Sequence, residues 1–198
     1  HCNYPPAYPQ KTINKDYIDK LKTYDPYIDN AINEAYSQYK IKVPKNLVKA
    51  VILQESGSVG WENAVSPCGA VGLMQQIPET ARSFGLKVPN YGTSRAVECD
   101  KINGNAYVKD NNCRSDQILN CKSNEDERYN TEKIILAGTL YLAQGYRKTG
   151  SFANTAAYYN GGPNAVSDST TCKNQKVWEC SSNENYKGTR EYVNFVLG

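Results

Sequence analysis

The sequence predicts a mainly helical domain whose loops are held by disulfide bonds. Apolar residues recur at intervals of three and four in several separate stretches, which is the spacing of a buried helix face. The seven cysteines have none of the paired Cys-x-x-Cys spacing of a zinc site, so we expect disulfides formed in an oxidising compartment. A chain of 198 residues with 39% hydrophobic content is long enough for one domain with its own core.

The chain begins with a segment, residues 1–24, that we expect to be an N-terminal arm. Residues 1–12 are rich in Pro and Tyr and show no helical period, so they are expected to be extended or disordered. Asp25 and Pro26 then have the form of a helix start, a capping side chain followed by a proline in the first turn. The apolar stripe that carries this helix to about residue 39 consists of Ile28, Ala31, Ile32, Ala35, Tyr36 and Tyr39.

A second helix is predicted over residues 44–56, and one residue in it, Glu55, has an unusual position. The apolar face of this helix consists of Leu47, Val48, Val51 and Ile52. Glu55 follows Ile52 and Val51 by three and four residues, so its side chain falls on that face. Burial and the negative end of the helix dipole both disfavour the ionised carboxyl, so we expect a raised pKa for Glu55. A carboxyl group that is neutral near pH 7 suits a general acid, and a Glu turned to solvent at a frayed helix end is the alternative.

The loop after this helix contains two residues of functional interest. Trp61 could stack on a sugar ring or be a buried structural residue. Glu62 is the first candidate for a second catalytic carboxylate, although nothing in the sequence fixes its geometry. Farther along, Pro78 and Glu79 predict the start of a short helix, whose N-terminus favours a negative charge, and Gly85 ends it.

Three helices are predicted in the last third of the chain. The clearest covers residues 131–146, with Asn130 as its cap. Its inward-facing residues are expected to be Ile134, Ile135, Gly138, Tyr141 and Leu142. A shorter helix over residues 152–159 ends at the Gly-Gly-Pro sequence of residues 161–163, and Thr189 is expected to cap a final helix that packs in the core.

Residues 87–130 are predicted to be an insertion. The segment contains three cysteines and many Asn and Asp residues, and its composition would bury little core. Six cysteines can form three disulfides, and our first hypothesis pairs Cys172 with Cys180, Cys113 with Cys121, and Cys68 with Cys99. Cys2 would then be unpaired, and a lipid anchor on it is an open alternative.

Composition and missing motifs exclude several classes of function. The only histidine is residue 1, so no serine or cysteine triad is expected, and the chain has no phosphate-binding loop or dinucleotide fingerprint, so we expect no cofactor. The acidic and amide residues between 100 and 112 lack the spacing of a calcium loop, so we expect no metal. The net charge of +3 suits an anionic polymer such as cell wall, whereas no dense Lys/Arg tract indicates a nucleic-acid partner. No apolar run approaches the roughly 18 residues of a membrane span, so we do not expect a transmembrane protein.

Three motifs occur in order along the chain. They are Glu55-Ser56, then Gly72-Leu73-Met74-Gln75, and then the sequence Ala-Tyr-Tyr-Asn-Gly-Gly-Pro of residues 157–163. With these motifs the sequence resembles the soluble lytic transglycosylase family of the lysozyme-like superfamily. The resemblance covers roughly residues 44–86 and 133–166, with a shorter echo at residues 188–193. It implies a single lysozyme-like helical domain over residues 1–198.

The resemblance also implies an activity and a set of site residues. The activity is cleavage of the β-1,4 bond between N-acetylmuramic acid and N-acetylglucosamine in peptidoglycan, with formation of 1,6-anhydromuramic acid ends. Glu55 would be the catalytic residue, and the Tyr159 hydroxyl would lie near it and orient its carboxyl group. The substrate-binding residues would be Ser56, Gly72, Leu73, Met74, Gln75, Tyr159 and Asn160. Met74 and Tyr159 could be core residues instead.

The sequence departs from the family pattern at two positions, and two other functions remain open. Ile134 stands where the family often has Asn, and Tyr158 stands where it usually has Ala. One alternative is a lysozyme-like hydrolase on the same fold that uses Glu62, or an acid of the insertion, to activate water. The other is a non-catalytic glycan-binding protein.

We expect an exported monomer, periplasmic or extracellular, that acts on peptidoglycan strands. A protein of the envelope or of a secretion apparatus is a candidate partner.

Overall fold

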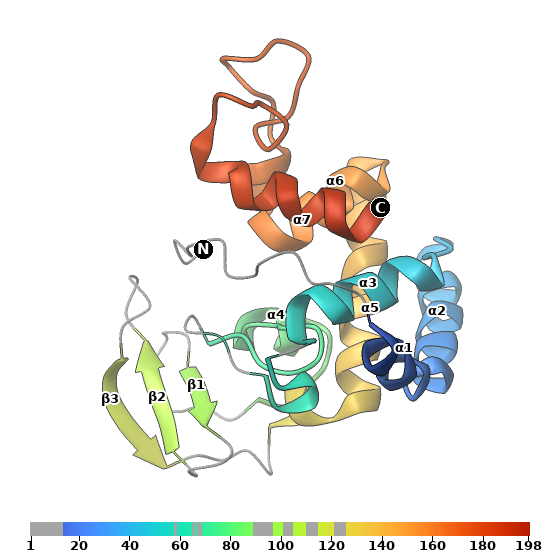
Figure 1. Cartoon of the computed structure of the whole chain (residues 1–198), viewed down its shortest axis with the longest axis vertical. Helices are drawn as coiled ribbons and strands as arrows, with labels where there is room; N and C mark the ends of the chain where they lie inside the picture. The colour runs from blue at the N-terminus through green and yellow to red at the C-terminus, as the bar shows by residue number, and fades with distance from the viewer. Residues whose placement is uncertain are drawn as a thin grey trace.

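The structure, a computed structural model, describes residues 14–57, 59–64, 66, 69–88 and 126–198, together with the backbone of three strands between residues 97 and 120. The α-helices are α1 (Lys15–Lys22), α2 (Asp25–Tyr39), α3 (Lys45–Ser56), α4 (Pro78–Ser83), α5 (Thr131–Thr149), α6 (Phe152–Gly161) and α7 (Lys187–Leu197). Short 3-10 helices are η1 (Trp61–Asn63), η3 (Glu127–Tyr129), η4 (Pro163–Val166) and η5 (Glu184–Tyr186). Helices make up most of the described chain in Figure 1, so the prediction of a mainly helical domain is confirmed.

Two helices precede the one that carries Glu55. α1 begins after Asn14, whose side chain accepts a hydrogen bond from the backbone N–H of Tyr17 at 3.0 Å. This helix falls within the predicted N-terminal arm, so the arm is helical over these residues, whereas residues 1–13 lie outside the described part. α2 covers the predicted range, but Asp25 is its first residue and not its cap. The Asp25 carboxylate lies instead 2.8 Å from Nζ of Lys49 in α3, an ion pair that sequence reasoning did not foresee.

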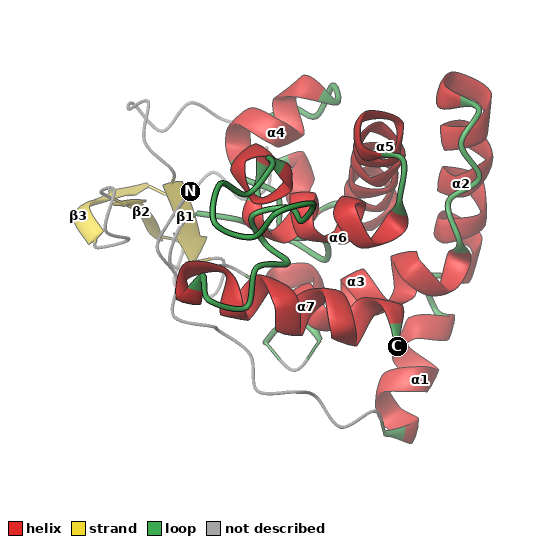
Figure 2. Cartoon of the chain, turned by 90° about the horizontal axis from the view of Figure 1, so that it is seen from above, coloured by secondary structure: helices red, strands yellow, loops and turns green. Residues whose placement is uncertain are grey.

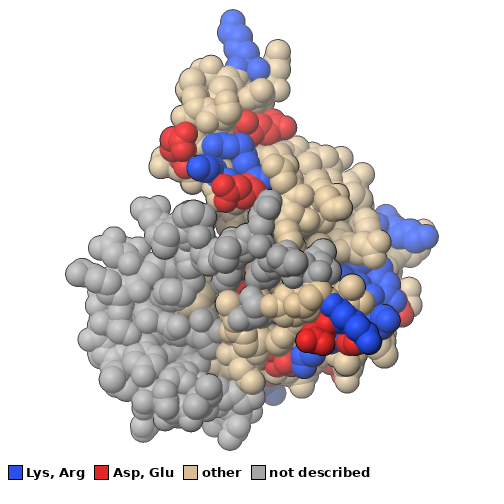
Figure 3. Space-filling view, viewed as in Figure 1, with Lys and Arg blue, Asp and Glu red and all other residues tan. Residues whose placement is uncertain are grey.

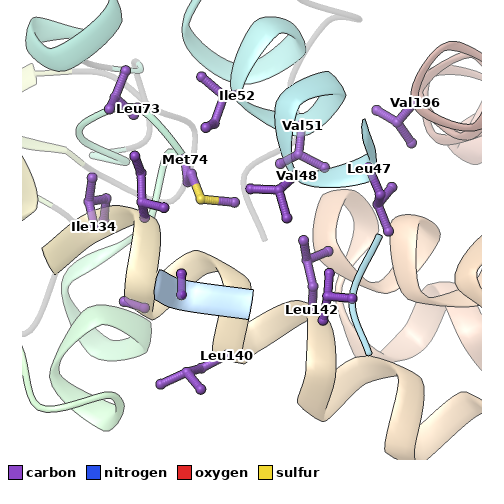
Figure 4. Packing of buried hydrophobic residues seen from close by; sticks show 14 of the residues in the cluster. Leu47, Val48, Val51, Ile52, Leu73, Met74, Ile134, Leu140, Leu142 and Val196 are labelled. Atoms are coloured by element: carbon purple, nitrogen blue, oxygen red, sulfur yellow. The ribbon is translucent and has the colours of Figure 1, made fainter. Parts of the chain in front are cut away.

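α3 lies at the centre of the described helices, as seen from above in Figure 2. Its buried residues are Leu47, Val48, Val51, Ile52, Leu53, Gln54 and Ser56, which occupy more than one face. Figure 4 shows Met74 between the side chains of α3 and those of α5. Gly138 of α5 permits this approach, because a Cβ at that position would lie 2.3 Å from the Met74 sulfur. The segment after Gly72 is therefore built into the core between two helices.

Capping side chains define the start of the helices in the last third of the chain. The Asn130 side chain accepts from the backbone N–H of Lys133 at 3.0 Å, which confirms the predicted cap of α5. This helix runs three residues past its predicted end and stops at Gly150, which has a φ of 76°. The predicted cap of α7 is wrong, because the helix begins at Lys187 and Thr189 lies inside it. The hydroxyl of Thr189 donates instead to Oδ1 of Asn160 in α6, at 2.8 Å.

A small antiparallel sheet lies within the insertion and was not predicted. Its strands are β1 (Val97–Asp100), β2 (Asn105–Lys109) and β3 (Ser115–Asn120), paired in the order β1-β2-β3. Glu98 of β1 pairs with Tyr107 of β2, which pairs on its other side with Ile118 of β3. Figures 1 and 2 both show the sheet to one side of the helices. The strands are short, and no long alternating apolar pattern marked them in the sequence.

One of the predicted disulfides is present in the described residues. Cys172 and Cys180 are bonded within the long loop between η4 and α7, as predicted. Arg190 of α7 anchors this loop, because its Nη1 donates to the carbonyl oxygens of Trp178, Cys180 and Asn183 at 3.1, 2.8 and 3.1 Å. The pairs predicted for Cys68 with Cys99 and for Cys113 with Cys121, and the fate of Cys2, lie outside the residues whose side chains are described.

The described surface carries charges of both signs. On the face drawn in Figure 3, lysine and arginine side chains lie next to aspartate and glutamate side chains. Among the helices that the structure describes, none combines the length and apolar character needed to cross a bilayer.

Candidate active site

Glu55 lies in the last turn of α3, where the helix approaches the surface. Its neighbours Leu53, Gln54 and Ser56 are buried, whereas Glu55 is partly exposed. Gly57 follows and ends the helix, with its N–H bonded to the carbonyl oxygen of Leu53 at 3.0 Å. A carboxyl group on a partly exposed residue at the end of a buried helix suits proton exchange with a bound ligand. The raised pKa expected for Glu55 stays a prediction.

Two tyrosines from the last two helices interact with Glu55. They are Tyr159 of α6 and Tyr192 of α7. Burial is the main cause that raises the pKa of both hydroxyls well above the usual range, and the negative charge of Glu55 raises them further. The Tyr192 hydroxyl is buried and makes no hydrogen bond of normal length and angle among the described residues, yet an interaction with the Glu55 carboxyl contributes to its raised pKa. Both phenols therefore stay neutral at physiological pH beside the carboxyl group.

Tyr159 joins two of the sequence motifs through a single hydrogen bond. Its hydroxyl donates to the backbone carbonyl oxygen of Met74 at 2.5 Å, across 85 residues of sequence. The family resemblance predicts that this hydroxyl lies near Glu55 and orients its carboxyl group. In the structure the hydroxyl donates to the backbone at Met74, and the negative charge of Glu55 is close enough to raise the pKa of Tyr159, so the orienting role stays a prediction. Tyr159 of the third motif therefore binds the turn of the second motif and interacts with Glu55 of the first.

The second motif forms a tight turn over residues 69–76, hereafter the 69–76 turn. Val71 and Gln76 form an isolated antiparallel bridge that closes it. Gly72 has a φ of 89° and Gln75 has a φ of 53°, both in the left-handed region. The side-chain Nε2 of Gln75 donates to the carbonyl oxygens of Ala64 and Gly72, each at 2.9 Å. These bonds direct the amide nitrogen into the protein, so the amide oxygen is the atom left to accept from a ligand.

The predicted substrate-binding residues differ in how their side chains are placed. Leu73 and Met74 are fully buried core residues, as the alternative stated for Met74, and neither presents accessible surface to a ligand in this structure. Ser56 is also fully buried, and its hydroxyl donates to the carbonyl oxygen of Ile52 at 3.0 Å. Gln75 is partly exposed and Asn160 is exposed. Direct contact of side chains with substrate therefore stays a prediction for Gln75, Asn160 and Tyr159.

Trp61 and Glu62 are held by the N-terminal helices. The Trp61 ring lies 5.9 Å from that of Tyr17 and 6.2 Å from that of Tyr24, centroid to centroid. Oε1 of Glu62 accepts hydrogen bonds from the Tyr24 hydroxyl at 2.6 Å and from Nζ of Lys20 at 3.1 Å. Burial opposes ionisation of Glu62, but the hydrogen bond from Tyr24, a backbone hydrogen bond and the contact with Lys20 together outweigh it and lower the pKa of this carboxyl. Glu62 is therefore an ionised structural group within this cluster.

Sequence reasoning missed several residues that organise this region. Tyr192 was contained in the short motif echo at residues 188–193, which was the signal that could have identified it. Arg128 and Asp126 form a buried ion pair beneath the 69–76 turn, for which no sequence pattern gave a sign. Tyr141 was predicted only as an inward-facing residue of its helix, and its packing against Tyr159, with ring centroids 5.2 Å apart, was not foreseen. Within the described residues, no group of three or more His, Cys, Asp or Glu converges to hold a metal ion.

The two raised tyrosine pKa values predict a loss of stability at alkaline pH. An unfolded tyrosine ionises near pH 10, whereas Tyr159 and Tyr192 remain protonated to higher pH in the folded protein. Unfolding then releases protons above about pH 10, so the stability these groups contribute is complete below that pH and is lost as the pH rises through their folded pKa values. Urea unfolding at about pH 8 and about pH 11 should show this fall, and Tyr192→Phe should reduce it. An equal fall in both proteins would contradict the prediction.

Comparison with known proteins supports the motif analysis. Residues 30–112 match the family described as Transglycosylase SLT domain. This range contains Glu55 and the 69–76 turn, whereas residues 133–166, the second stretch of the predicted resemblance, lie outside it.

Two solved structures are similar to the chain. One is the complex of the 70-kDa soluble lytic transglycosylase with bulgecin A, at 22% identity and a TM-score of 0.47. The other is the 70-kDa soluble lytic transglycosylase SLT70 from Escherichia coli, at 23% identity and a TM-score of 0.46. Each match covers 89% of this chain but only 25% of the other protein, so the chain spans about a quarter of the length of those enzymes. The family match agrees with the motifs quoted from the sequence, and residues 30–112 of this chain are therefore similar to the transglycosylase SLT family.

Proposed function

We propose that this protein is a peptidoglycan lytic transglycosylase that cleaves the β-1,4 bond between N-acetylmuramic acid and N-acetylglucosamine. The observation that carries the proposal is the position of Glu55, which emerges from a buried helix beside Tyr159 and Tyr192. The family match over residues 30–112, which includes Glu55, agrees with it. A peptidoglycan substrate also requires export, which the Cys172–Cys180 disulfide supports.

Glu55 performs both proton transfers of the proposed reaction. As an acid, it protonates the oxygen that leaves with N-acetylglucosamine when the bond to C1 of muramic acid breaks. As the resulting carboxylate, it accepts the proton of the 6-hydroxyl of the same muramic acid, whose oxygen forms the new bond to C1. The product carries a 1,6-anhydro end, no water is consumed, and Glu55 returns to its protonated form. The neutral phenols of Tyr159 and Tyr192 place no second negative charge beside the carboxyl group.

Mass spectrometry of fragments released from purified peptidoglycan tests this function. Anhydro ends, lighter by one water than the hydrolysis product, are the expected result. Reducing ends would show a hydrolase of the lysozyme type. Release of no fragments by folded protein that still binds the glycan would favour a non-catalytic binding protein.

The hydrolase alternative makes a separate prediction about Glu62. A hydrolase that used Glu62 to activate water would lose at least about 10²-fold in rate on Glu62→Gln, because the amide is not a base. We expect a much smaller change, within about threefold, since Glu62 serves to hold η1 on α1 and α2 through Lys20 and Tyr24. Initial rates of fragment release, measured below the melting temperature of both proteins, distinguish the two outcomes.

A further inference from the structure

Arg128 is the largest fully buried side chain in the described structure. It lies in η3, at the point where the chain returns from the insertion to the helices. Its Nε and Nη2 donate to the two carboxylate oxygens of Asp126, at 3.0 and 2.8 Å. Asp126 is only 3% exposed, so both charges are withdrawn from water and neutralise each other. A buried ion pair of this kind is weak support for stability, since apolar residues of similar volume would serve at least as well.

The remaining donor group of Arg128 bridges the two ends of the 69–76 turn. Its Nη1 donates to the carbonyl oxygen of Gly69 at 2.9 Å and to that of Gln76 at 3.1 Å. The backbone carbonyl of Arg128 also packs against the middle of the turn, because a Cβ on Gly72 would lie 2.2 Å from its oxygen. One residue therefore contacts the turn at its start, its middle and its end.

The 69–76 turn transmits this constraint to the surroundings of Glu55. The carbonyl of Met74, inside the turn, accepts the hydrogen bond of Tyr159, and Glu55 interacts with Tyr159 electrostatically. The backbone N–H of Gly72 donates to the carbonyl of Ala64 at 2.9 Å, which ties the turn to the loop that follows α3. Ile134 is the neighbour of Gly72 on α5 and offers apolar packing only, so Arg128 adds two hydrogen bonds to the turn that this helix does not provide.

The ends of the insertion are joined where this ion pair lies. The backbone N–H of Glu127 donates to the carbonyl of Lys87 at 2.9 Å, and the N–H of Lys87 donates to the Glu127 carboxylate at 2.7 Å. Arg82 of α4 adds two donors to the carbonyl of Val88, at 3.3 and 3.0 Å. The backbone that carries Arg128 is thus fixed on the main body independently of the strands of the insertion.

We propose that Arg128, held by Asp126, is a positioning residue for the transglycosylase reaction, because it sets the turn that supports Tyr159 beside Glu55. The inference rests on the proposed function. Lysine cannot replace arginine in this position, since a single ammonium group cannot pair with both carboxylate oxygens and also bridge two carbonyls. A small displacement of the turn then moves the supports of the catalytic carboxyl, and displacements of about 1 Å can cost about 10²-fold in rate.

The test is a double-mutant cycle on kcat with Arg128→Lys and Tyr159→Phe, measured at a temperature where circular dichroism shows every variant folded. Arg128→Lys should lower kcat by about 10- to 100-fold with little change in KM, because the carboxyl is misplaced rather than the glycan lost. The double variant should be about as slow as the slower single variant, since both changes act through the Met74 carbonyl. Multiplying losses would overturn the proposal. Asp126→Asn, which keeps the shape of the pair and weakens it, serves as the second variant if Arg128→Lys does not fold.

A control and an activity-independent measurement separate this inference from the proposed function. Leu21→Ala removes buried apolar contacts in α1, outside the turn, and should lower the melting temperature with kcat unchanged for the folded protein.

Hydrogen exchange should speed up at the amides of Val71, Gly72 and Gln76 in Arg128→Lys, with no change in α2. If the wild-type protein cleaves no glycan, the proposed function fails, and faster exchange in the turn would still establish the structural half of the inference. An active wild type with an equally active Arg128→Lys variant would overturn the inference alone.

Discussion

Replacing Glu55 with glutamine should reduce glycan cleavage by about 10²- to 10⁴-fold or more while the protein stays folded. Glutamine has nearly the same shape as glutamate, but its amide can neither donate a proton to the leaving oxygen nor accept one from the 6-hydroxyl. Both steps of the proposed reaction are lost at once, because the same group performs them. The side chain is partly exposed at the end of α3, so the change creates no cavity. The rate of release of anhydro-ended fragments measures the effect.

The same substitution at Glu79 is the matched control for this prediction. Glu79 lies in the first turn of α4, where a negative charge is favourable, and it belongs to none of the three motifs. Glu79→Gln should leave the cleavage rate unchanged and lower the free energy of unfolding by about 0.3–1 kcal/mol. Wild-type rates for Glu55→Gln would remove Glu55 from the mechanism and with it both enzymatic interpretations of the fold.

The helices could be predicted because their signals are local. The spacing of apolar residues predicted α2, α3 and α5, and the cap of α5 followed from the identity of Asn130 alone. The cap predicted at Thr189 failed because its hydroxyl donates to Asn160 on another helix, and the actual cap of α7, Tyr186, lies three residues earlier. A side chain that prefers a cap locally was used for a tertiary contact instead, which no local pattern indicates.

The candidate site shows the same division between local and tertiary information. Glu55 was predicted from its place on one helix, and three motifs that resemble a known family identified the segments around it. The contacts that hold the site cross large stretches of sequence, 85 residues between Tyr159 and Met74 and 59 between Arg128 and Gly69. Arg128 belongs to none of the three motifs, and an arginine side chain is usually expected at the surface. Its buried position became visible only with Asp126 and the 69–76 turn in place.

Replacing Gly72 with alanine should strongly destabilise the protein, by about 3–5 kcal/mol in the free energy of unfolding. Two costs add at this position. A φ of 89° is left-handed, which costs a residue with a Cβ about 1–2 kcal/mol. The new Cβ would also lie 2.2 Å from the carbonyl oxygen of Arg128, a backbone atom of η3 that is fixed by the Asp126 pair and cannot turn aside. A loss of this size corresponds to a fall of roughly 6–20 °C in melting temperature for a chain of this length.

Gly85→Ala carries only the first cost, because Gly85 has nearly the same φ, 86°, and apart from its own chain neighbours no described atom lies within 4 Å of the position that its new Cβ would take. It should lose only the left-handed contribution, about 1–2 kcal/mol. The difference between the two variants, measured by urea unfolding, therefore reports the close approach of Gly72 to Arg128. Gly72→Ala should also reduce cleavage in the fraction that remains folded, since relief of the clash displaces the turn that carries the Met74 carbonyl. Equal losses of stability in both variants would mean that this approach does not exist in solution, and the proposed role of Arg128 would lose its structural basis.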